Sequence, residues 1–276
     1  MALDLAGKRA LIFGVAADSS IAWGIAQELA KHGVTCTMGY QKRFLSRVMQ
    51  LFKDTPWIET WHECDVTKEE SVAQFFAEAQ GEFDMLVHCI AFAPAEALQN
   101  PIDQTTAADF ATALDVSAYS LLRLVHHAMP RMTPTGSVVS LTYLGADRTV
   151  PGYRVMGTAK AALQQLTREL AVVCGEKGIR VNAISAGPIR TLAASGVPGF
   201  DTILDWMAHS APLKRNVNQD DVAKAALFLL SDLGSGVTGQ TLYVDAGYTS
   251  VGVPPELDKI RLPGKGAKQV MFGAPS

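Results

Sequence analysis

Residues 9–24, RALIFGVAADSSIAWG, place a short apolar run directly before a turn of small residues and a helical pattern. A buried strand, such a turn and a helix N-terminus together suit a pyrophosphate, because unpaired backbone N–H groups and the positive helix end converge on the anion. We expect Gly14 to allow the tight turn, Gly24 to allow close helix packing, and Ser20 to cap the helix and donate to phosphate. The spacing departs from GxGxxG, so a well-capped helix without a ligand is the alternative.

The same order of strand and helix continues along nearly the whole chain. Apolar runs predict strands at 9–13, 35–40, 85–89, 137–141, 181–184 and 241–244, with a weaker candidate at 58–62. Helical spacing covers 21–32, 71–80, 107–129, 156–176 and 220–230. The alternation predicts an α/β fold, a single Rossmann-type doubly wound parallel sheet of about seven strands with helices on both faces.

Composition fits one ordinary globular domain. The 276 residues are 48% hydrophobic and 18% charged, which supplies a large core and excludes a disordered chain. The net charge of −3 predicts neither a nucleic-acid partner nor a membrane surface. Four cysteines without a CxxC pair, and the lack of an export signal or a membrane span, predict reduced thiols and the cytoplasm.

Two stretches interrupt the alternation of strands and helices. Residues 186–212 are long for a connection and rich in glycine and proline, so we expect a mobile segment with a short helix at 200–209. Within it, about 191–209 would form a substrate lid on a catalytic domain spanning residues 1–250. Residues 251–276 read as a C-terminal tail, either packed on another subunit or loose.

Tyr143, Tyr153 and Lys160 are the strongest catalytic candidates. A phenol with a pKa of about 10 is a poor acid unless a nearby cation and sugar hydroxyls assist it. Tyr153 and Lys160 are seven residues apart, which is two helical turns, so we expect them to project from one helix face. Lys160 would then grip the nicotinamide ribose, although a tyrosine and a lysine on one face are often only surface residues.

The adenosine end of the expected cofactor site does not decide between NADH and NADPH. An acidic residue normally holds the ribose of NAD after the second strand, but here Gln41, Lys42 and Arg43 follow it. Gln41 can bond ribose hydroxyls, whereas Lys42 and Arg43 can accept the 2′-phosphate of NADPH or remain solvated. Asp65 with Val66 is well placed for the adenine edge.

The motifs together resemble those of the bacterial NAD(P)H-dependent enoyl-acyl-carrier-protein reductases, within the short-chain dehydrogenase/reductase superfamily. The resemblance spans about residues 5–248 and rests on G-x5-SIA-x-G at 14–24, HCIA at 88–91, Y-x6-K at 153–160 and the segment 180–191. Ordinary members of the superfamily carry TGxxxGxG, NNAG and YxxxK instead.

The resemblance implies a reaction, a cofactor and a set of site residues. The reaction is reduction of the trans-2 double bond of an enoyl thioester on acyl carrier protein in fatty-acid elongation. The cofactor is NADH, with NADPH possible because of Lys42 and Arg43; no metal is expected, and the enzyme is a homotetramer. Tyr143, Tyr153 and Lys160 are catalytic, and Ala93, Met156 and Phe200 contact substrate. Cofactor contacts are Gly14, Ser20, Ile21, Gln41, Asp65, Val66, Ile90, Lys160, Ile189, Arg190, Thr191, Leu192 and Ala193.

Two alternatives belong to other functional classes. A carbonyl reductase of the same fold needs a serine about 13 residues before the tyrosine, and Ser140 occupies that position, but position 157 is Gly157 where YxxxK requires lysine. A nucleotide-sensing or scaffold protein would keep the dinucleotide site without chemistry. The presence of Tyr153 and Lys160 argues against it.

Overall fold

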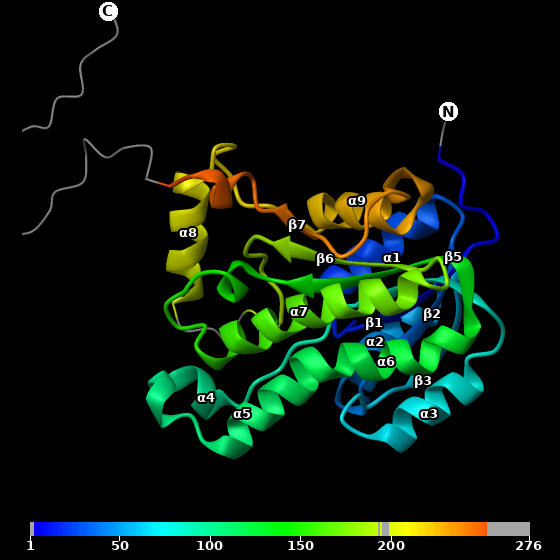
Figure 1. The fold of residues 1–276 in the computed structure, drawn as a ribbon, viewed down its shortest axis with the longest axis horizontal. Coiled ribbons are helices and arrows are strands. Elements are labelled where there is room, and N and C mark those ends of the chain that lie inside the picture. Colours follow the sequence, from blue (N-terminus) through cyan, green and yellow to red (C-terminus); the bar gives the residue numbers. More distant parts are fainter. Residues whose placement is uncertain (1–2, 193, 195–198, 253–276) are drawn as a thin grey trace, which may run out of the picture.

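Seven parallel strands form one sheet in the computed structural model, which describes residues 3–192, 194 and 199–252 (Figure 1). The order across the sheet is β3-β2-β1-β4-β5-β6-β7. The strands are β1 (Arg9–Phe13), β2 (Thr35–Tyr40), β3 (Ile58–Glu63), β4 (Phe83–His88), β5 (Met132–Thr142), β6 (Arg180–Ala186) and β7 (Thr241–Val244). The chain starts at β1 in the middle, adds β2 and β3 on one side, then crosses to β4. This confirms the doubly wound parallel sheet.

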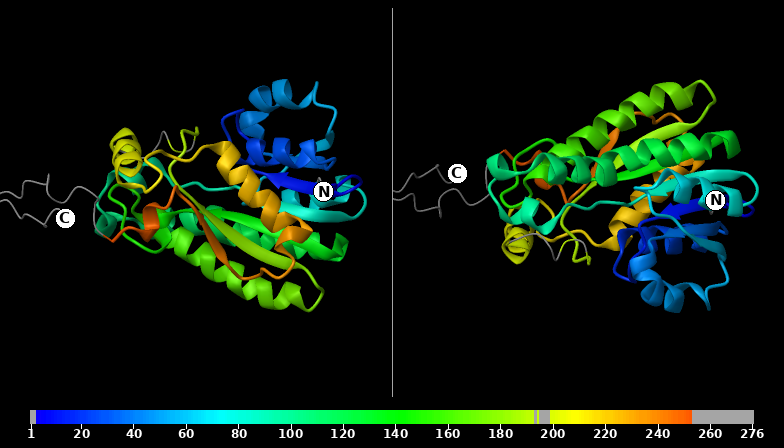
Figure 2. Two further views of the ribbon diagram at one scale, coloured as in Figure 1. Left: turned by 90° about the horizontal axis from the view of Figure 1, so that it is seen from above. Right: turned by 90° about the horizontal axis from the view of Figure 1, so that it is seen from below.

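Helices cover both faces of the sheet. They are α1 (Ile21–Lys31), α2 (Leu45–Phe52), α3 (Glu69–Glu78), α4 (Ala95–Gln99), α5 (Ala107–Leu114), α6 (Ser120–Ala128), α7 (Val155–Gly175), α8 (Phe200–Ser210) and α9 (Gln219–Leu230). Figure 2 shows α1, α2 and α9 on one face and α3, α6 and α7 on the other. None of the helices that the structure describes is long and apolar enough to span a bilayer.

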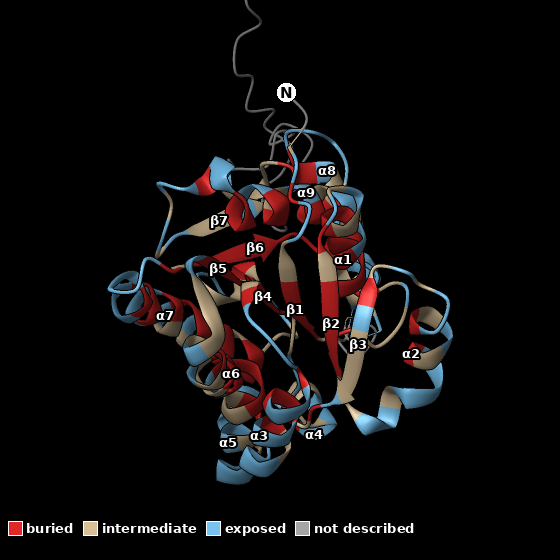
Figure 3. Cartoon of the chain, turned by 90° about the vertical axis from the view of Figure 1, so that its right-hand side faces the viewer, coloured by how far each residue is buried: buried red, intermediate tan, exposed pale blue. Residues whose placement is uncertain are grey.

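Alternate residues of a strand pack into two separate hydrophobic cores, one on each face of the sheet. Ala10 and Ile12 of β1 pack in the core under α1 and α9, while Leu11 and Phe13 pack in the core under α3 and α6. This division follows from the two-residue period of a strand. In Figure 3 the central strands are buried almost throughout, whereas the edge strands β3 and β7 are partly covered.

The structure differs from the expected number of helices in three places. The continuous helix expected at 107–129 is divided into α5, a π-helical turn at Asp115–Tyr119 and α6, followed by a 3-10 turn. Sequence analysis missed α2 and α4, because each is short and buries only one or two residues. The helix expected at 200–209 is confirmed as α8. The tail expected from 251 onward lies outside the described residues beyond Gly252.

Candidate active site

A cavity of about 840 Å³ opens at the carboxyl ends of the strands. Its walls come from the loops that follow β1 to β6, on both sides of the β1–β4 pair. This pair is the point where the strand order reverses, and ligands of open α/β sheets bind in the crevice there.

The turn after β1 is built for an anion. Gly14 has a φ of +106°, and a Cβ at this position would lie 2.2 Å from the carbonyl oxygen of Cys89, so only glycine fits. Ser20 Oγ accepts the N–H groups of Ala16 (3.0 Å) and Ala17 (3.1 Å), which leaves its own proton to donate into the cavity that Ser20 lines. The first turn of α1 has no acidic residue to repel phosphate.

One part of that expectation was wrong. The side chain of Ser20 does not cap α1, although its backbone occupies the N-cap position. Its hydroxyl is engaged with the preceding turn instead. The turn therefore fits a pyrophosphate through loop geometry and the open helix end, and not through a side-chain cap.

At the adenosine end, the structure separates the expected contacts into two groups. Gln41, Arg43 and Val66 line the cavity, whereas Lys42 and Asp65 do not. The Asp65 carboxylate instead accepts the backbone N–H of Thr67 at 3.1 Å and its hydroxyl at 2.7 Å.

Arg43 contributes a cation to this wall. Its guanidinium lies 4.7 Å from the ring centre of Phe44 and 5.3 Å from that of Phe92. Within the described part of the chain, no carboxylate pairs with it. A guanidinium on aromatic faces keeps its edge donors available for a planar oxyanion.

The structure brings the three catalytic candidates together in the same cavity. Lys160 is buried, and its Nζ donates to the carbonyl oxygen of Leu141 at 2.7 Å. Burial lowers the pKa of Lys160 to about 8, although the thiol of Cys89 opposes this shift. The rings of Tyr143 and Tyr153 pack edge to face with centres 4.9 Å apart. Burial raises the pKa of Tyr143 to about 12 and also raises the pKa of Tyr153, so both phenols act as hydrogen-bond donors at neutral pH.

The reason given for the pairing of Tyr153 and Lys160 was wrong. Helix α7 begins at Val155, so Tyr153 precedes it and the two residues do not share a helix face. Arg154 between them has a φ of +47°, a conformation that costs a non-glycine residue about 1 to 3 kcal/mol. Its Nε donates to the carbonyl oxygen of Leu98 at 2.8 Å. This anchored turn, and not helical periodicity, places the phenol on the cavity that Lys160 also lines.

Two positions exclude the carbonyl-reductase arrangement. A Cβ on Gly157 would lie 2.7 Å from the carbonyl oxygen of Gly145, so a lysine cannot occupy position 157 of this fold without moving α7. Ser140, at the spacing of a carbonyl-reductase serine, is fully buried and bonds Thr167 Oγ1 at 3.2 Å. It does not line the cavity.

Most of the other residues expected to contact cofactor or substrate line the cavity. The expected substrate contacts Ala93, Met156 and Phe200 do so, as do the expected cofactor contacts Ile21, Ile90, Ile189, Thr191 and Leu192. Arg190 does not, because it pairs with Asp201 at 2.6 Å. Ala193 lies outside the described residues. Sequence analysis missed Thr112 and Val116, whose four-residue spacing is equally typical of a helix face in a core.

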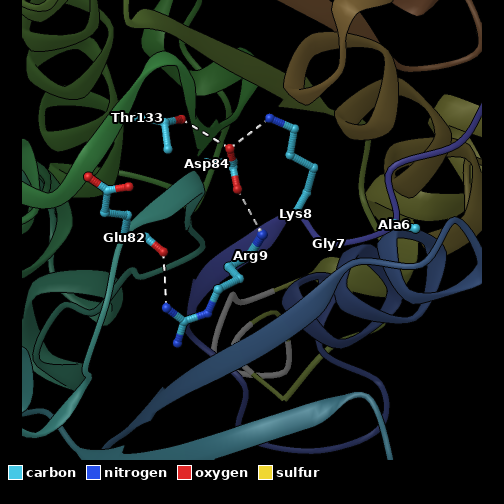
Figure 4. A pocket seen from close by; sticks show the side chains of 7 residues that line it. All are labelled: Ala6, Gly7, Lys8, Arg9, Glu82, Asp84 and Thr133. Atoms are coloured by element: carbon cyan, nitrogen blue, oxygen red, sulfur yellow. Dashed lines mark hydrogen bonds and ion pairs between the residues drawn. The ribbon is translucent and has the colours of Figure 1, made fainter.

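A second, open hollow of about 410 Å³ lies at the opposite end of the sheet (Figure 4). Asp84 accepts Lys8 Nζ at 2.8 Å, the Arg9 backbone N–H at 3.0 Å and Thr133 Oγ1 at 3.0 Å. Every charge that Asp84 could offer a ligand is thus already paired. Among the described residues, no group of three or more His, Cys, Asp or Glu side chains is placed to hold a metal ion.

Known proteins of similar sequence belong to one family. The sequence profile of the family described as Enoyl-(Acyl carrier protein) reductase matches residues 14–249. The enoyl-acyl-carrier-protein reductase (NADH) of Nostoc sp. is 46% identical over 91% of this chain and all of its own length. The corresponding enzyme 1 of Rhizobium meliloti is 46% identical over 90% of this chain and 92% of its own.

Solved structures give the same result. The enoyl-acyl-carrier-protein reductase of Anaplasma phagocytophilum, in complex with NAD, superposes with a TM-score of 0.86 at 44% identity, covering 91% of this chain and 97% of its own. The Bacillus cereus enzyme, in complex with NADP+ and indole naphthyridinone, gives 0.87 at 41% identity, covering 92% and 100%.

Proposed function

The chain belongs to the enoyl-(acyl carrier protein) reductase family, and we propose that Tyr153, Lys160 and Tyr143 carry its reaction in the cavity at the carboxyl ends of the sheet. It is an NADH-dependent oxidoreductase that reduces the trans-2 double bond of enoyl thioesters in fatty-acid synthesis. We assign these residues because Tyr153 and Lys160 both line the cavity. In addition, Gly157 is tightly packed at the position where a carbonyl reductase needs its lysine.

The cavity has the residues to hold the dinucleotide along its length. Gly14, Ser20 and the open end of α1 would bind the pyrophosphate, and Gln41 with Val66 would hold the adenosine. When bound, the reduced nicotinamide supplies a hydride to the β-carbon of the thioester. Lys160, buried and without a carboxylate partner in the described part of the chain, would hold the ribose of that half.

Tyr153 would stabilise the enolate oxygen of the thioester. Its pKa is raised by burial and by the neighbouring Tyr143, so the phenol remains protonated and donates a hydrogen bond as negative charge develops. One such donor contributes about 3 kcal/mol to a transition state. Lys160 adds positive charge near the same place. Tyr143, packed edge-on against Tyr153, would orient that phenol or relay a proton during protonation of the α-carbon.

Helix α8 would cover the acyl chain. Phe200 and Ile203 line the cavity, while Leu204 and Met207 of the same helix are buried. Gly199 is the N-cap residue of the helix, and its φ of +72° is a left-handed conformation that glycine adopts without strain. A greasy substrate requires a cover that excludes water and opens for release. Hydrogen exchange in α8 that is already slow without ligand, and unchanged by NAD+ plus an acyl thioester, would contradict this lid.

The protein would assemble from copies of itself, most simply as a tetramer. Val172 and Val173 of α7 are 70% and 60% exposed, and Phe110 and Tyr119 are exposed on the same helical layer. An apolar surface of this kind on a folded chain is typical of an interface between identical subunits. Light scattering is the test, and a mass near 29.5 kDa at micromolar concentration would contradict the assembly.

The cytoplasm is the compartment that we propose. In the structure the thiols of Cys36, Cys64, Cys89 and Cys174 are all free. Free thiols in or near the core fit a reducing compartment.

Turnover is the experiment that tests the function. NADH oxidation, followed by the loss of reduced-nicotinamide absorbance, should proceed with crotonyl and longer enoyl thioesters and not with simple ketones. A protein that binds NADH tightly and reduces neither class would be a nucleotide-binding protein without chemistry. Reduction of ketones alone would identify a carbonyl reductase.

A further inference from the structure

A π-helical turn, at Asp115–Tyr119 between α5 and α6, contacts the loop after β4 directly and the loop after β3 through Arg123 of α6. Such turns contain one extra residue and are frequent at functional sites. We propose that this turn positions both halves of the dinucleotide site. Ser117 orients the loop after β4, and Arg123, held by the turn, orients the loop after β3. The proposal rests on the proposed function, since it assigns the first loop to the nicotinamide half and the second to the adenosine half.

Ser117 fixes the backbone of Phe92. Ser117 is fully buried, and its Oγ accepts the Phe92 N–H at 2.9 Å. The same Oγ lies 2.9 Å from the Phe92 carbonyl oxygen and 3.7 Å from Met156 Sδ, so its one proton donates to either acceptor. Phe92 and Met156 both line the cavity. The hydroxyl thus fixes the wall on which we place the nicotinamide ribose and the substrate, without entering the cavity itself.

Arg123 fixes the carbonyl group of Val66 from behind. Its Nη1 donates to the Val66 carbonyl oxygen, and its Nη2 lies 3.2 Å from Asp115 Oδ1. The guanidinium also stacks 4.7 Å from the ring centre of Tyr119, and Nε lies 3.2 Å from Glu69 Oε2. Two hydrogen bonds and the ring of Tyr119 leave this planar group one orientation. Val66 lines the adenosine end of the cavity, and Arg123 does not.

The position of the turn explains how one element reaches both loops. Figure 1 shows α5 and α6 as one rod that runs from the neighbourhood of α4 to that of α3. The turn between them presents Val116 to the cavity directly, Ser117 to the loop after β4, and Asp115 and Tyr119 to Arg123. A regular α-helix of the same length would carry one residue fewer here and would rotate these groups out of register.

The two loops can be tested separately with a fragment of the cofactor. ADP carries the adenosine and the pyrophosphate but neither the second ribose nor the nicotinamide. Calorimetric titration should show that Arg123→Met weakens both ADP and NADH by about tenfold, as expected when a charged hydrogen bond no longer orders the loop. Ser117→Ala should leave ADP affinity within about twofold while weakening NADH, and raising the KM of the enoyl thioester, by about fivefold.

Matched controls distinguish positioning from general stability. Arg131 Nη1 donates to the carbonyl oxygen of Ala79, and Ser137 Oγ donates to that of Leu229 at 2.9 Å, both away from the cavity. Arg131→Met and Ser137→Ala should lower the thermal midpoint as much as the test variants do, and leave both affinities unchanged. The proposal is overturned if Arg131→Met weakens ADP as much as Arg123→Met, or if Ser117→Ala weakens ADP and NADH equally. Failure of wild-type turnover would overturn the proposed function alone, because these titrations require no reaction.

Discussion

Among the described residues, charged side chains are paired at one end of the sheet and lack a counter-ion at the other. At the amino ends of the strands, Asp84 takes three donors, and Arg9 binds Glu59 through two nitrogens at 2.9 and 2.7 Å. At the carboxyl ends, Lys160 and Arg43 face the cavity, and no described carboxylate pairs with either.

This difference indicates that one end of the sheet serves stability and the other serves ligand binding. A charge that already has its partners stabilises the fold and offers little to a ligand. A buried cation without a counter-ion costs free energy, and that cost is recovered when an anion or a developing anion arrives. We therefore expect substitutions at the amino end to change stability and those at the carboxyl end to change function.

The largest expected effect is that of Tyr153→Phe at the carboxyl end. Removing the phenol hydroxyl should lower kcat about a hundredfold, because the hydrogen bond that it donates is strongest when the enolate forms. The free energy of unfolding should barely change. Tyr243→Phe is the control, since its hydroxyl donates to Asp147 at 2.8 Å outside the cavity. Steady-state kinetics measure both variants. Wild-type kcat in Tyr153→Phe would contradict the role given to this phenol.

The amino end should respond in the opposite manner to Asp84→Ala. Removing the carboxylate that accepts three donors should reduce the free energy of unfolding by about 2 kcal/mol. The kcat and the KM for NADH should stay within about twofold of wild type. Denaturant titration and steady-state kinetics give the two readings, with the exposed Asp54→Ala as control. An Asp84 variant that keeps its stability but binds NADH poorly would break the contrast between the two ends.

Much of this architecture was predictable because strand ends are marked in the sequence. The apolar runs at 9–13, 35–40 and 241–244 match three strands to the residue, and each stops at a glycine or a polar residue. The π-helical turn was not predictable, because the hydrophobic spacing through 107–129 fits one continuous helix. Its extra residue depends on contacts such as Ser117 with Phe92, which join segments 25 residues apart.

The sequence predicted which residues line the site better than it predicted how they are arranged. Tyr153 and Lys160 do meet in one cavity, but through a turn at Arg154 whose φ of +47° no local propensity favours. Arg190 was expected on the cofactor from the family resemblance, and only the location of α8 shows that Asp201 pairs with it. Distant contacts of this kind leave no spacing signal in one sequence.

The pH dependence of cofactor binding sharpens the comparison further. The pKa of Lys160 is lowered to about 8, so its ammonium is charged below that pH and neutral above it. The dissociation constant for NADH should rise by up to about tenfold per pH unit above pH 8. Lys160→Met should bind NADH more weakly with no break near pH 8, whereas Lys8→Met, at the paired end, should keep the wild-type profile. A break that persists in Lys160→Met would belong to another group.

The same pKa predicts a stability change with a definite sign. Because the lowered pKa belongs to a cation, the unfolded chain binds more protons than the folded one between pH 8 and 10.5. The free energy of unfolding should therefore rise with pH across this window, and should do so less in Lys160→Met. Denaturant titration at several pH values measures the slope.

The smallest expected effect concerns the other unpaired cation, Arg43. Wild-type enzyme should prefer NADH, because Gln41 offers ribose hydroxyls a neutral partner. Arg43 lines the cavity and Lys42 does not, so a 2′-phosphate would meet the guanidinium. Arg43→Ala should lower kcat/KM with NADPH by about tenfold, the value of one charged hydrogen bond, and with NADH by less than about twofold. Lys42→Ala, one residue away with the same charge, should change neither.

The outcome of that pair of variants decides what the unpaired charge at the adenosine end does. Equal losses with both cofactors in Arg43→Ala would mean that the side chain serves as a wall, through its contacts with the rings of Phe44 and Phe92, and not as a phosphate partner. A loss with NADPH in Lys42→Ala would place the phosphate on the outer side of the turn after β2. A lower kcat/KM that is confined to NADPH and to Arg43→Ala would show that the guanidinium recognises the 2′-phosphate by its charge. The contrast between the two ends of the sheet predicts this outcome, because Arg43 has no carboxylate partner among the described residues.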